Sequence, residues 1–222
     1  AVIVDVEAPP TRISKEVEAA ETMIGRTQDR FALKPRHVAG DVAYGTGKML
    51  GWLVDHGIEP HIPVKDQSEI ASTGSFVRAD FDYDEKRDVY ICPNGKTLTT
   101  TGRVFSGNTL YYRASKRDCD QCPLKARCCP KSPVRRVQRD VNEPARDIAR
   151  SLTGIEPYRQ SAVERKKIEM LFGEVKTVLG LTRLRLRGLT GAHDKFLLTA
   201  TVQNLKRLVK RVAIPPPITV AA

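Results

Sequence analysis

The sequence predicts an α/β fold, a sheet with flanking helices that is interrupted by a small cysteine-containing, β-rich insertion. Two observations predict it. Over residues 1–64, strand-like and helix-like segments alternate in the order strand, helix, strand, helix, strand, which indicates an α/β layer with at least one parallel pair. Residues 67–157 instead carry short strand-like runs, a turn signal and all five cysteines. A chain of 222 residues can bury one substantial core, or one core with a smaller module.

Hydrophobic patterning places the predicted elements along the chain. The N-terminal part is predicted to hold a strand over Ala1–Glu7, a helix from about Ser14 to Asp29, a strand over Pro35–Tyr44, a helix over Lys48–Gly57 and a strand over Ile58–Val64. The middle part is predicted to hold strands within Gly74–Asp82, Glu85–Ile91 and Tyr111–Ala114. The C-terminal part is predicted to hold helices over Val163–Lys176 and Phe196–Val212 and a loose proline-rich tail over 213–222.

Asp41 lies near the end of the second predicted strand. The carboxyl ends of strands are where α/β sheets place ligand chemistry, so Asp41 is a candidate functional residue. The pattern alone favours a simpler role for it, as a turn residue that caps Gly45 or the following helix.

The helix predicted over Val163–Lys176 has two distinct faces. Apolar residues at helical spacing predict a buried stripe, made of Ile168, Leu171, Phe172, Val175 and Leu179. Beside this stripe, Glu169 shares a face with Arg165, Gly173 and Lys176. Such charged pairs are usually a solvated surface. A glycine within a helix, however, costs about 1 kcal/mol relative to alanine, which favours the close approach of a large ligand. The carboxylate can hold a divalent metal ion, and the cations suit phosphate.

The cysteines form a candidate metal site. Their odd number, without a secretion signal, argues against a disulfide framework. Cys92-Pro-Asn-Gly-Lys has the shape of a metal knuckle, and Cys119-x-x-Cys122 has the usual spacing of zinc ligands. The sequence therefore predicts a four-cysteine zinc site through Cys92, Cys119, Cys122 and Cys128, with Cys129 as a fifth cysteine outside it. A reduced, metal-free cluster is a close alternative, and an iron–sulfur cluster is a third.

The charge of the chain predicts a polyanionic partner. The net charge is +11, and residues 151–222 hold 13 lysines and arginines against five acids, a net charge of +8. In Leu181–Leu189, the cations Arg183, Arg185 and Arg187 alternate with leucines, so all three would point one way if this segment were extended. Nucleic acid is favoured over a membrane surface, because no long amphipathic helix with aromatic anchors is visible. No apolar run approaches the roughly 20 residues that span a bilayer.

The face formed by Arg165, Glu169 and Lys176 matches R-x-x-x-E followed by six residues and K. This is the core of the signature around the last acidic residue in DDE transposases of bacterial insertion sequences. The family form usually adds a Tyr where this chain has Ala162. The runs KKIEMLFGEVK, RLRLRGL, GDVAYG and DCDQCPLKARC also resemble the branch of these transposases that carries a cysteine-bearing insertion, so the resemblance covers nearly the whole chain.

The resemblance implies a ribonuclease H-like mixed sheet. Residues 1–66 would form the first half of the catalytic domain, 67–157 the insertion, 158–212 the second half and 213–222 the tail. The implied activity is metal-dependent strand cleavage and transfer at transposon ends, in which three carboxylates hold two Mg²⁺ ions. Asp41 and Glu169 match the second and third carboxylates, and Arg165 and Lys176 would bind phosphates of the DNA, together with Arg183, Arg185 and Arg187.

The resemblance also carries expectations about the whole protein. The partner would be double-stranded DNA, bound by a homodimer, in the bacterial cytoplasm at the nucleoid. The first carboxylate would lie on a strand before Ala1, with Asp5 as a weaker substitute, so the chain is expected to be a catalytic-domain fragment with reduced activity. The alternative is a non-catalytic DNA-binding module with a zinc knuckle and a basic C-terminal helix, in which Asp41 and Glu169 are structural.

Overall fold

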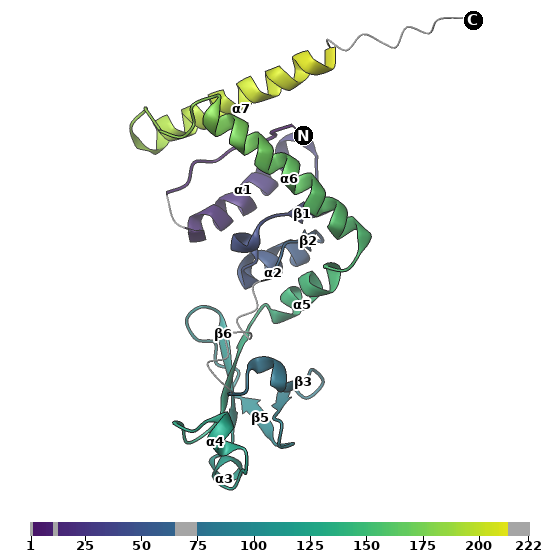
Figure 1. Ribbon diagram of the computed structural model, residues 1–222, viewed down its shortest axis with the longest axis vertical. Helices are drawn as coiled ribbons and strands as arrows, with labels where there is room; N and C mark the ends of the chain where they lie inside the picture. Colours follow the sequence, from purple (N-terminus) through teal and green to yellow (C-terminus); the bar gives the residue numbers. More distant parts are fainter. Residues whose placement is uncertain (1, 11–12, 65–74, 213–222) are drawn as a thin grey trace, which may run out of the picture. The chain divides into compact units, whose positions relative to one another are not determined.

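The helices and strands of the chain belong to two compact units (Figure 1). The computed structural model describes residues 2–10, 13–64 and 75–212. The first unit consists of Ala1–Tyr44, Trp52–Ile62 and Leu152–Ala222, and the second of Gly45–Gly51 and Pro63–Ser151. The predicted domain boundary between residues 66 and 67 and the predicted tail over 213–222 lie outside the described residues.

The first unit is built on a pair of parallel strands. β1 (His37–Ala39) pairs with β2 (Glu59–His61), with Val38 opposite Pro60. Between them the chain forms the short 3-10 helix η1 (Val42–Tyr44) and then α2 (Gly47–Asp55), whose first five residues belong to the second unit and which buries Leu53 in its part in the first unit. This strand–helix–strand connection confirms the predicted α/β organisation with one parallel pair. α1 (Ile13–Phe31) precedes it, close to the predicted bounds, and buries Val17.

Two long helices complete the first unit. α6 (Glu156–Thr177) contacts both β1 and β2, and Figure 1 shows it in green beside them. The contact is polar at its centre, because His61 Nδ1 lies 2.7 Å from the Ser161 hydroxyl and both side chains are buried. α7 (Gly188–Val212) begins earlier than predicted and is joined to α6 where Gln203 Nε2 donates to Glu174 at 3.0 Å. None of the helices in the described ranges is long and apolar enough to cross a membrane.

The strand predicted over Ala1–Glu7 is wrong for the residues that the structure describes. Residues 2–10 belong to no strand, and Val2 and Val4 are exposed. A strand requires a neighbour that pairs with its backbone, whereas here a side chain does so: Asn204 Oδ1 accepts from Ile3 N–H at 2.9 Å and Asn204 Nδ2 donates to Ile3 O at 2.8 Å.

The buried stripe predicted for α6 is also largely wrong. Val175 is buried, but Ile168 is 42% exposed and Phe172 is 57% exposed. The helix packs on β1 and β2 through its polar N-terminal half, around Ser161 and Arg165, so the apolar stripe further along the helix does not face that sheet. The helix itself is confirmed and extends further toward the N-terminus than predicted.

The second unit holds a five-stranded antiparallel sheet in the order β3-β4-β5-β6-β7. The strands are β3 (Asp82–Asp84), β4 (Val89–Ile91), β5 (Thr97–Thr100), β6 (Thr109–Ala114) and β7 (Arg136–Asp140). One face of the sheet buries a core of Phe81, Tyr90, Leu98, Tyr112 and Val137. The helical segments of this unit are η3 (Arg78–Asp80), α3 (Lys116–Asp120), α4 (Lys125–Cys128) and, over most of its length, α5 (Glu143–Leu152).

The sequence predicted this sheet only in part. β4 falls within a predicted strand, and β6 contains the strand predicted over Tyr111–Ala114 and begins two residues earlier, but β5, β7 and α5 were not predicted. The strand predicted in Gly74–Asp82 is wrong over its described residues, because η3 occupies their centre. In the described residues the parallel and antiparallel strands lie in separate sheets, so the mixed sheet of a ribonuclease H-like fold and the status of residues 67–157 as an insertion stay predictions.

The stability of the first unit is expected to fall on mild acidification. Burial lowers the pKa of His61, and neighbouring His37 lowers it further, against the opposing effect of Glu59. The folded His61 therefore binds a proton less readily than the unfolded residue does. As the pH falls through about 6.5, the unfolded state takes up more protons and the free energy of unfolding decreases, until the pH passes below the folded-state pKa.

Denaturant unfolding followed by circular dichroism at about pH 8 and about pH 5.5 measures this effect. His61→Gln should reduce the loss of stability between the two pH values, whereas His56→Gln, on an exposed histidine, should leave it unchanged. An equal loss in the His61→Gln variant and the unaltered chain would contradict the assignment to His61.

Candidate functional site

Asp41 lies in the turn that follows β1. The strand ends at Ala39, and Asp41 Oδ1 accepts from the Ala43 N–H at 2.8 Å, which shapes η1. Asp41 is exposed, and within the described part of the chain its Oδ2 makes no hydrogen bond. Asp41 is therefore a turn residue, although it accepts from Ala43 in η1 rather than capping Gly45 or α2, and its second carboxylate oxygen is open to a ligand.

Arg165 connects this turn to Glu169. Its Nη1 donates to the Gly40 carbonyl at 2.9 Å, and its Nε lies 3.2 Å from Glu169 Oε1. The guanidinium thus joins the backbone immediately before Asp41 to the Glu169 carboxylate, although the two acids are far apart in the sequence. The Glu169 side chain is 60% exposed and the Arg165 side chain 33% exposed, so this contact lies at the surface of the first unit.

The contacts of Arg165 add to the role predicted for it. The sequence predicted a phosphate ligand, whereas the half-buried guanidinium already binds a carbonyl and a carboxylate of the protein.

Sequence reasoning missed the buried pair below Arg165, His61 and Ser161, which holds the N-terminal half of α6 against β2. A histidine inside a strand and a serine one turn before Arg165 gave no recognisable signal of this contact.

Asp5, considered as a substitute carboxylate, has a structural role. Both of its oxygens bind Arg26, with Oδ2 2.8 Å from Nε and Oδ1 2.9 Å from Nη2. Burial alone would raise the pKa of Asp5, but the hydrogen bonds from Arg26 and the Val6 N–H outweigh burial and lower it. A carboxylate held this firmly by a guanidinium is a poor metal ligand, because a metal ion would have to displace the arginine.

The carboxylates of Asp41 and Glu169 suit one divalent ion. Mg²⁺ binds through one or two carboxylates and completes its coordination with water and phosphate oxygens. Both carboxylates are exposed, and both belong to residues that adjoin the contacts of Arg165. Among the described residues, no three His, Cys, Asp or Glu side chains are placed to hold a metal ion together. The two carboxylates thus have the donor chemistry that Mg²⁺ requires, without a preformed three-ligand group among the described residues.

The predicted phosphate ligands near the C-terminus lie on exposed structure. Residues 181–187 belong to no helix or strand, so the extended arrangement considered for Arg183, Arg185 and Arg187 is not formed as a strand, but all three are exposed and form the expected cationic stretch. The segment is held from α7, where Lys195 Nζ donates to the Gly180 carbonyl at 3.0 Å and also to the Arg183 carbonyl. Lys176 is exposed near the end of α6.

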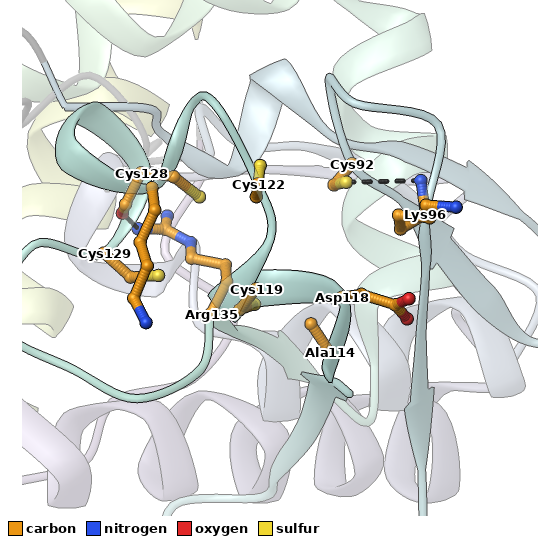
Figure 2. Close-up of a pocket in the computed structure, with 10 residues that line it drawn as sticks. Cys92, Lys96, Ala114, Asp118, Cys119, Cys122, Cys128, Cys129 and Arg135 are labelled. Carbon is orange, nitrogen blue, oxygen red and sulfur yellow. Dashed lines mark hydrogen bonds between the residues drawn. The ribbon is translucent and has the colours of Figure 1, made fainter. Parts of the chain in front are cut away.

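Cys92 lies in a tight hairpin between β4 and β5. The Lys96 N–H donates to Cys92 Sγ at 3.3 Å, and Cys92 N–H donates to the Lys96 carbonyl at 2.8 Å. Gly95 has φ +71°, which a glycine adopts without the strain of a side chain. This is the knuckle geometry expected from the sequence, with a backbone N–H directed at sulfur, and Figure 2 shows it as the dashed line from Cys92 to Lys96.

The other cysteines lie across one small pocket from Cys92 (Figure 2). They come from α3, from the turn after it and from the end of α4, and they are Cys119, Cys122, Cys128 and Cys129. The pocket has a volume of about 20 Å³, of the order of one water molecule or one ion. Cys92 and the later cysteines thus share a cavity although 26 residues separate Cys92 from Cys119. As placed, no three of the sulfurs form a ready metal-binding group.

The surroundings of Cys128 and Cys129 favour the protonated form of these two thiols. Burial raises the pKa of Cys128 to about 11, against the lowering effect of Arg135. Burial and the neighbouring Cys119 raise the pKa of Cys129 as well. A metal ion binds thiolates, so binding in this pocket would have to displace protons and would strengthen as the pH rises.

Comparison with known proteins gives one match. A family model described as the transposase DDE domain matches residues 91–209, which is more than half of the chain. No curated protein matches the chain. No solved structure matches it either.

Proposed function

The chain belongs to the family of transposase DDE domains, and from this premise we propose that it is the catalytic part of a bacterial insertion-sequence transposase that cleaves and transfers DNA strands at transposon ends. The observation that supports this most is the contact of Arg165 with both the Gly40 carbonyl and the Glu169 carboxylate. It joins the backbone beside Asp41 to Glu169 on an exposed surface where a DNA strand has access. The domain membership itself implies a polynucleotidyl transferase that acts on DNA.

In the proposed mechanism, Asp41 and Glu169 hold the divalent ion that DDE transposases generally use. When bound, such an ion makes the attacking oxygen more nucleophilic and stabilises the leaving oxygen. Arg165 positions Glu169 by fixing the direction of its carboxylate, and the hydrogen bond from the Ala43 N–H fixes Asp41. The exposed Lys176 would bind a phosphate of the DNA on the same helix.

Catalysis by residues 1–222 alone is proposed to be weak. The family resemblance implies three carboxylates, and the described residues offer two for the site, Asp41 and Glu169, because Asp5 is bound to Arg26. One ion with fewer ligands would bind less tightly and would stabilise only part of the charge that develops during strand cleavage. The measurement that tests the site should therefore report metal binding directly as well as cleavage.

Iron-mediated cleavage of the protein backbone tests the metal site. Fe²⁺ takes the place of Mg²⁺ at carboxylate sites, and the hydroxyl radicals that it generates with peroxide and ascorbate cut the chain nearby. We expect cuts close to residues 41 and 169. Asp41→Asn and Glu169→Gln should each weaken both cuts, because the two residues share one ion.

Glu164→Gln provides the matched control, since Glu164 is an exposed acid on the same helix whose partner is Lys167. It should leave the cutting pattern unchanged. Cuts that persist in Asp41→Asn and Glu169→Gln would overturn the assignment. If those variants also left the strand cleavage of the complete transposase intact, the non-catalytic DNA-binding reading would be favoured.

The DNA partner is proposed to be double-stranded, bound by a homodimer, with the phosphate contacts concentrated near the C-terminus. Three exposed arginines lie in one five-residue stretch after α6, at positions 183, 185 and 187. Arginine suits the forked contact with phosphate oxygens. Because such contacts position the protein without reading bases, the cluster should bind any duplex.

A salt titration of duplex binding tests the arginine cluster. Replacing Arg183, Arg185 and Arg187 with alanine should weaken binding to all duplexes alike. If each arginine contacts one phosphate, the triple replacement should also flatten the slope of log K against log salt by about 2.7, since each phosphate contact contributes about 0.9. A variant of equal charge in the second unit, with alanine at Lys86, Arg87 and Lys131, is the control and should retain most of the slope. Equal loss in both variants would show that only the total charge matters.

The cysteine pocket is proposed to bind one Zn²⁺ through Cys92, Cys119, Cys122 and Cys128. Supporting observations are the N–H donated to Cys92 Sγ and the pocket that all the cysteines line. Zinc would require the side chains to turn about their Cα–Cβ bonds until four sulfurs stand about 2.3 Å from one centre. The metal would be structural, tying the β4–β5 hairpin to α3 and α4.

Metal analysis and cobalt substitution test this site. The purified chain should hold about one zinc, and Co²⁺ in its place should give the absorption of a tetrahedral thiolate site. Cys92→Ser and Cys122→Ser should abolish both signals, whereas Cys129→Ser should retain them. Metal affinity should rise with pH, because the thiols lose protons on binding. A chain purified without metal that gives no cobalt absorption would favour the reduced, metal-free cluster.

A further inference from the structure

The face of the five-stranded sheet that lies opposite its core carries an open groove of about 630 Å³. We call it the sheet groove. It combines hydroxyls, two aromatic rings and two arginines with a single acid, and its lining residues are Thr97, Thr99, Thr101, Phe105, Tyr111, Arg113, Ala114, Ser115, Asp118 and Arg136. Ala114 and Asp118 also line the cysteine pocket, whereas the other lining residues belong neither to that pocket nor to the proposed carboxylate site.

The groove follows from the alternation of side chains along the strands. In β5, β6 and β7 the residues that face the core include Leu98, Tyr112 and Val137. Their neighbours in sequence face the other way, and the strand register aligns them: Thr99 is opposite Arg113, and Arg113 is opposite Arg136. A row of polar and cationic side chains therefore crosses three strands.

The two arginines of this row lack a counter-charge. Like charges directly opposite each other on neighbouring strands are destabilising. Among the residues that the structure describes, neither Arg113 nor Arg136 forms an ion pair, and both are exposed. Asp118, which also lines the groove, is the one acid that faces it. An anion placed between the two guanidinium groups would relieve their repulsion.

An aromatic pair lies beside the arginines. The rings of Phe105 and Tyr111 meet edge to face, with centroids 4.9 Å apart. The guanidinium of Arg136 lies 5.2 Å from the Tyr111 centroid, and that of Arg103 lies 5.1 Å from the Phe105 centroid. Phe105 is 41% exposed in the loop before β6. Contacts of this kind at exposed sites are worth only about 0.5–1 kcal/mol, so a ligand with phosphates and flat rings could displace them.

We propose that the sheet groove binds a single strand of DNA. This inference rests on the proposed function for the DNA partner and adds a second contact surface to it. A single strand offers both groups that the groove suits, phosphates for Arg113 and Arg136 and unstacked bases for Phe105 and Tyr111. The bases of a duplex are already stacked and paired, so a duplex could use the arginines but not the rings.

Fluorescence anisotropy with the full 222-residue chain tests the proposal. The probes are a labelled oligothymidylate of about 12 nucleotides and a duplex of the same length. Phe105→Ala with Tyr111→Ala should weaken single-strand binding by about tenfold or more, because stacking on an aromatic side chain contributes on that order per base. The same variant should leave duplex binding within about twofold, since the duplex uses phosphate contacts elsewhere.

Arg113→Ala with Arg136→Ala should flatten the salt dependence of single-strand binding by about 1.4, at about 0.7 per phosphate contact. Lys86→Ala with Arg87→Ala removes the same charge from the β3–β4 turn and should change single-strand binding by less than about twofold. Phe105→Ala alone, in an exposed loop, provides a variant that leaves the sheet undisturbed, and circular dichroism checks the fold of each chain.

The outcomes separate this proposal from the proposed function. Unchanged single-strand binding in the aromatic variants contradicts the proposal that the sheet groove binds a single strand, but it does not count against duplex binding or the carboxylate site. An equal loss of single-strand and duplex binding also overturns it, because the groove would then be a patch that contacts phosphates alone. Tighter binding of the matching RNA oligonucleotide overturns the choice of DNA. Failure of the unaltered chain to bind duplex would instead count against the proposed function.

Discussion

The seating of α6 on β1 and β2 is the constraint on which the first unit depends. It is a polar contact: His61 and Ser161 meet below the surface, and one turn further along the helix Arg165 reaches the Gly40 carbonyl. Polar contacts have directions, so they fix the rotation and the register of a helix more tightly than an apolar stripe would. A helix turned by one residue would carry Glu169 roughly 100° away from the turn at Asp41. The orientation of Glu169 thus depends on the contact between His61 and Ser161 and on Arg165, which itself binds the Glu169 carboxylate.

The second unit differs from the first, because it is a small sheet with only one buried face. Its core is aromatic, with Tyr90 and Tyr112 in edge-to-face contact, and a buried aromatic hydroxyl needs a partner. Tyr112 donates to Asp88 at 2.6 Å, and Tyr83 donates to the same carboxylate at 2.8 Å. At the start of α5, the buried carboxylate of Glu143 binds Arg78, Arg146 and Arg150; burial would raise its pKa, but these arginines lower it. The sheet is therefore stabilised from one side, which leaves the opposite face open as the sheet groove.

The sequence predicted elements whose cause is local and missed those whose cause lies elsewhere in the chain. The helices α1, α2, α6 and α7 follow from hydrophobic periodicity, the parallel pair from the strand order, and the Cys92 hairpin from a glycine in a turn. All of these predicted elements are present. β5 was missed because its threonines show little hydrophobic alternation, and it forms because β4 and β6 pair with it on both sides. Residues 2–7 have strand propensity, yet the backbone of Ile3 is paired by the side chain of Asn204 in α7. For the site, a motif could single out Asp41 and Glu169, but only the structure shows that Arg165 joins the Gly40 carbonyl to the Glu169 carboxylate, because these contacts depend on how α6 packs.

Gly173 shows how the fold and the proposed site bear on each other. A Cβ atom at this position would meet nothing within 4 Å, so no packing within the described structure requires a glycine here. The residue nevertheless lies within α6, where glycine costs about 1 kcal/mol relative to alanine. It stands one turn beyond Glu169, on the face that also carries Arg165 and Lys176. Because no contact within the described structure explains this loss of helix stability, we infer that a ligand requires the glycine. A DNA phosphate backbone bound by Lys176 and Arg165 would pass directly over the helix at Gly173. The same face would then supply the metal ligand, the cations and the clearance that DNA needs to reach them.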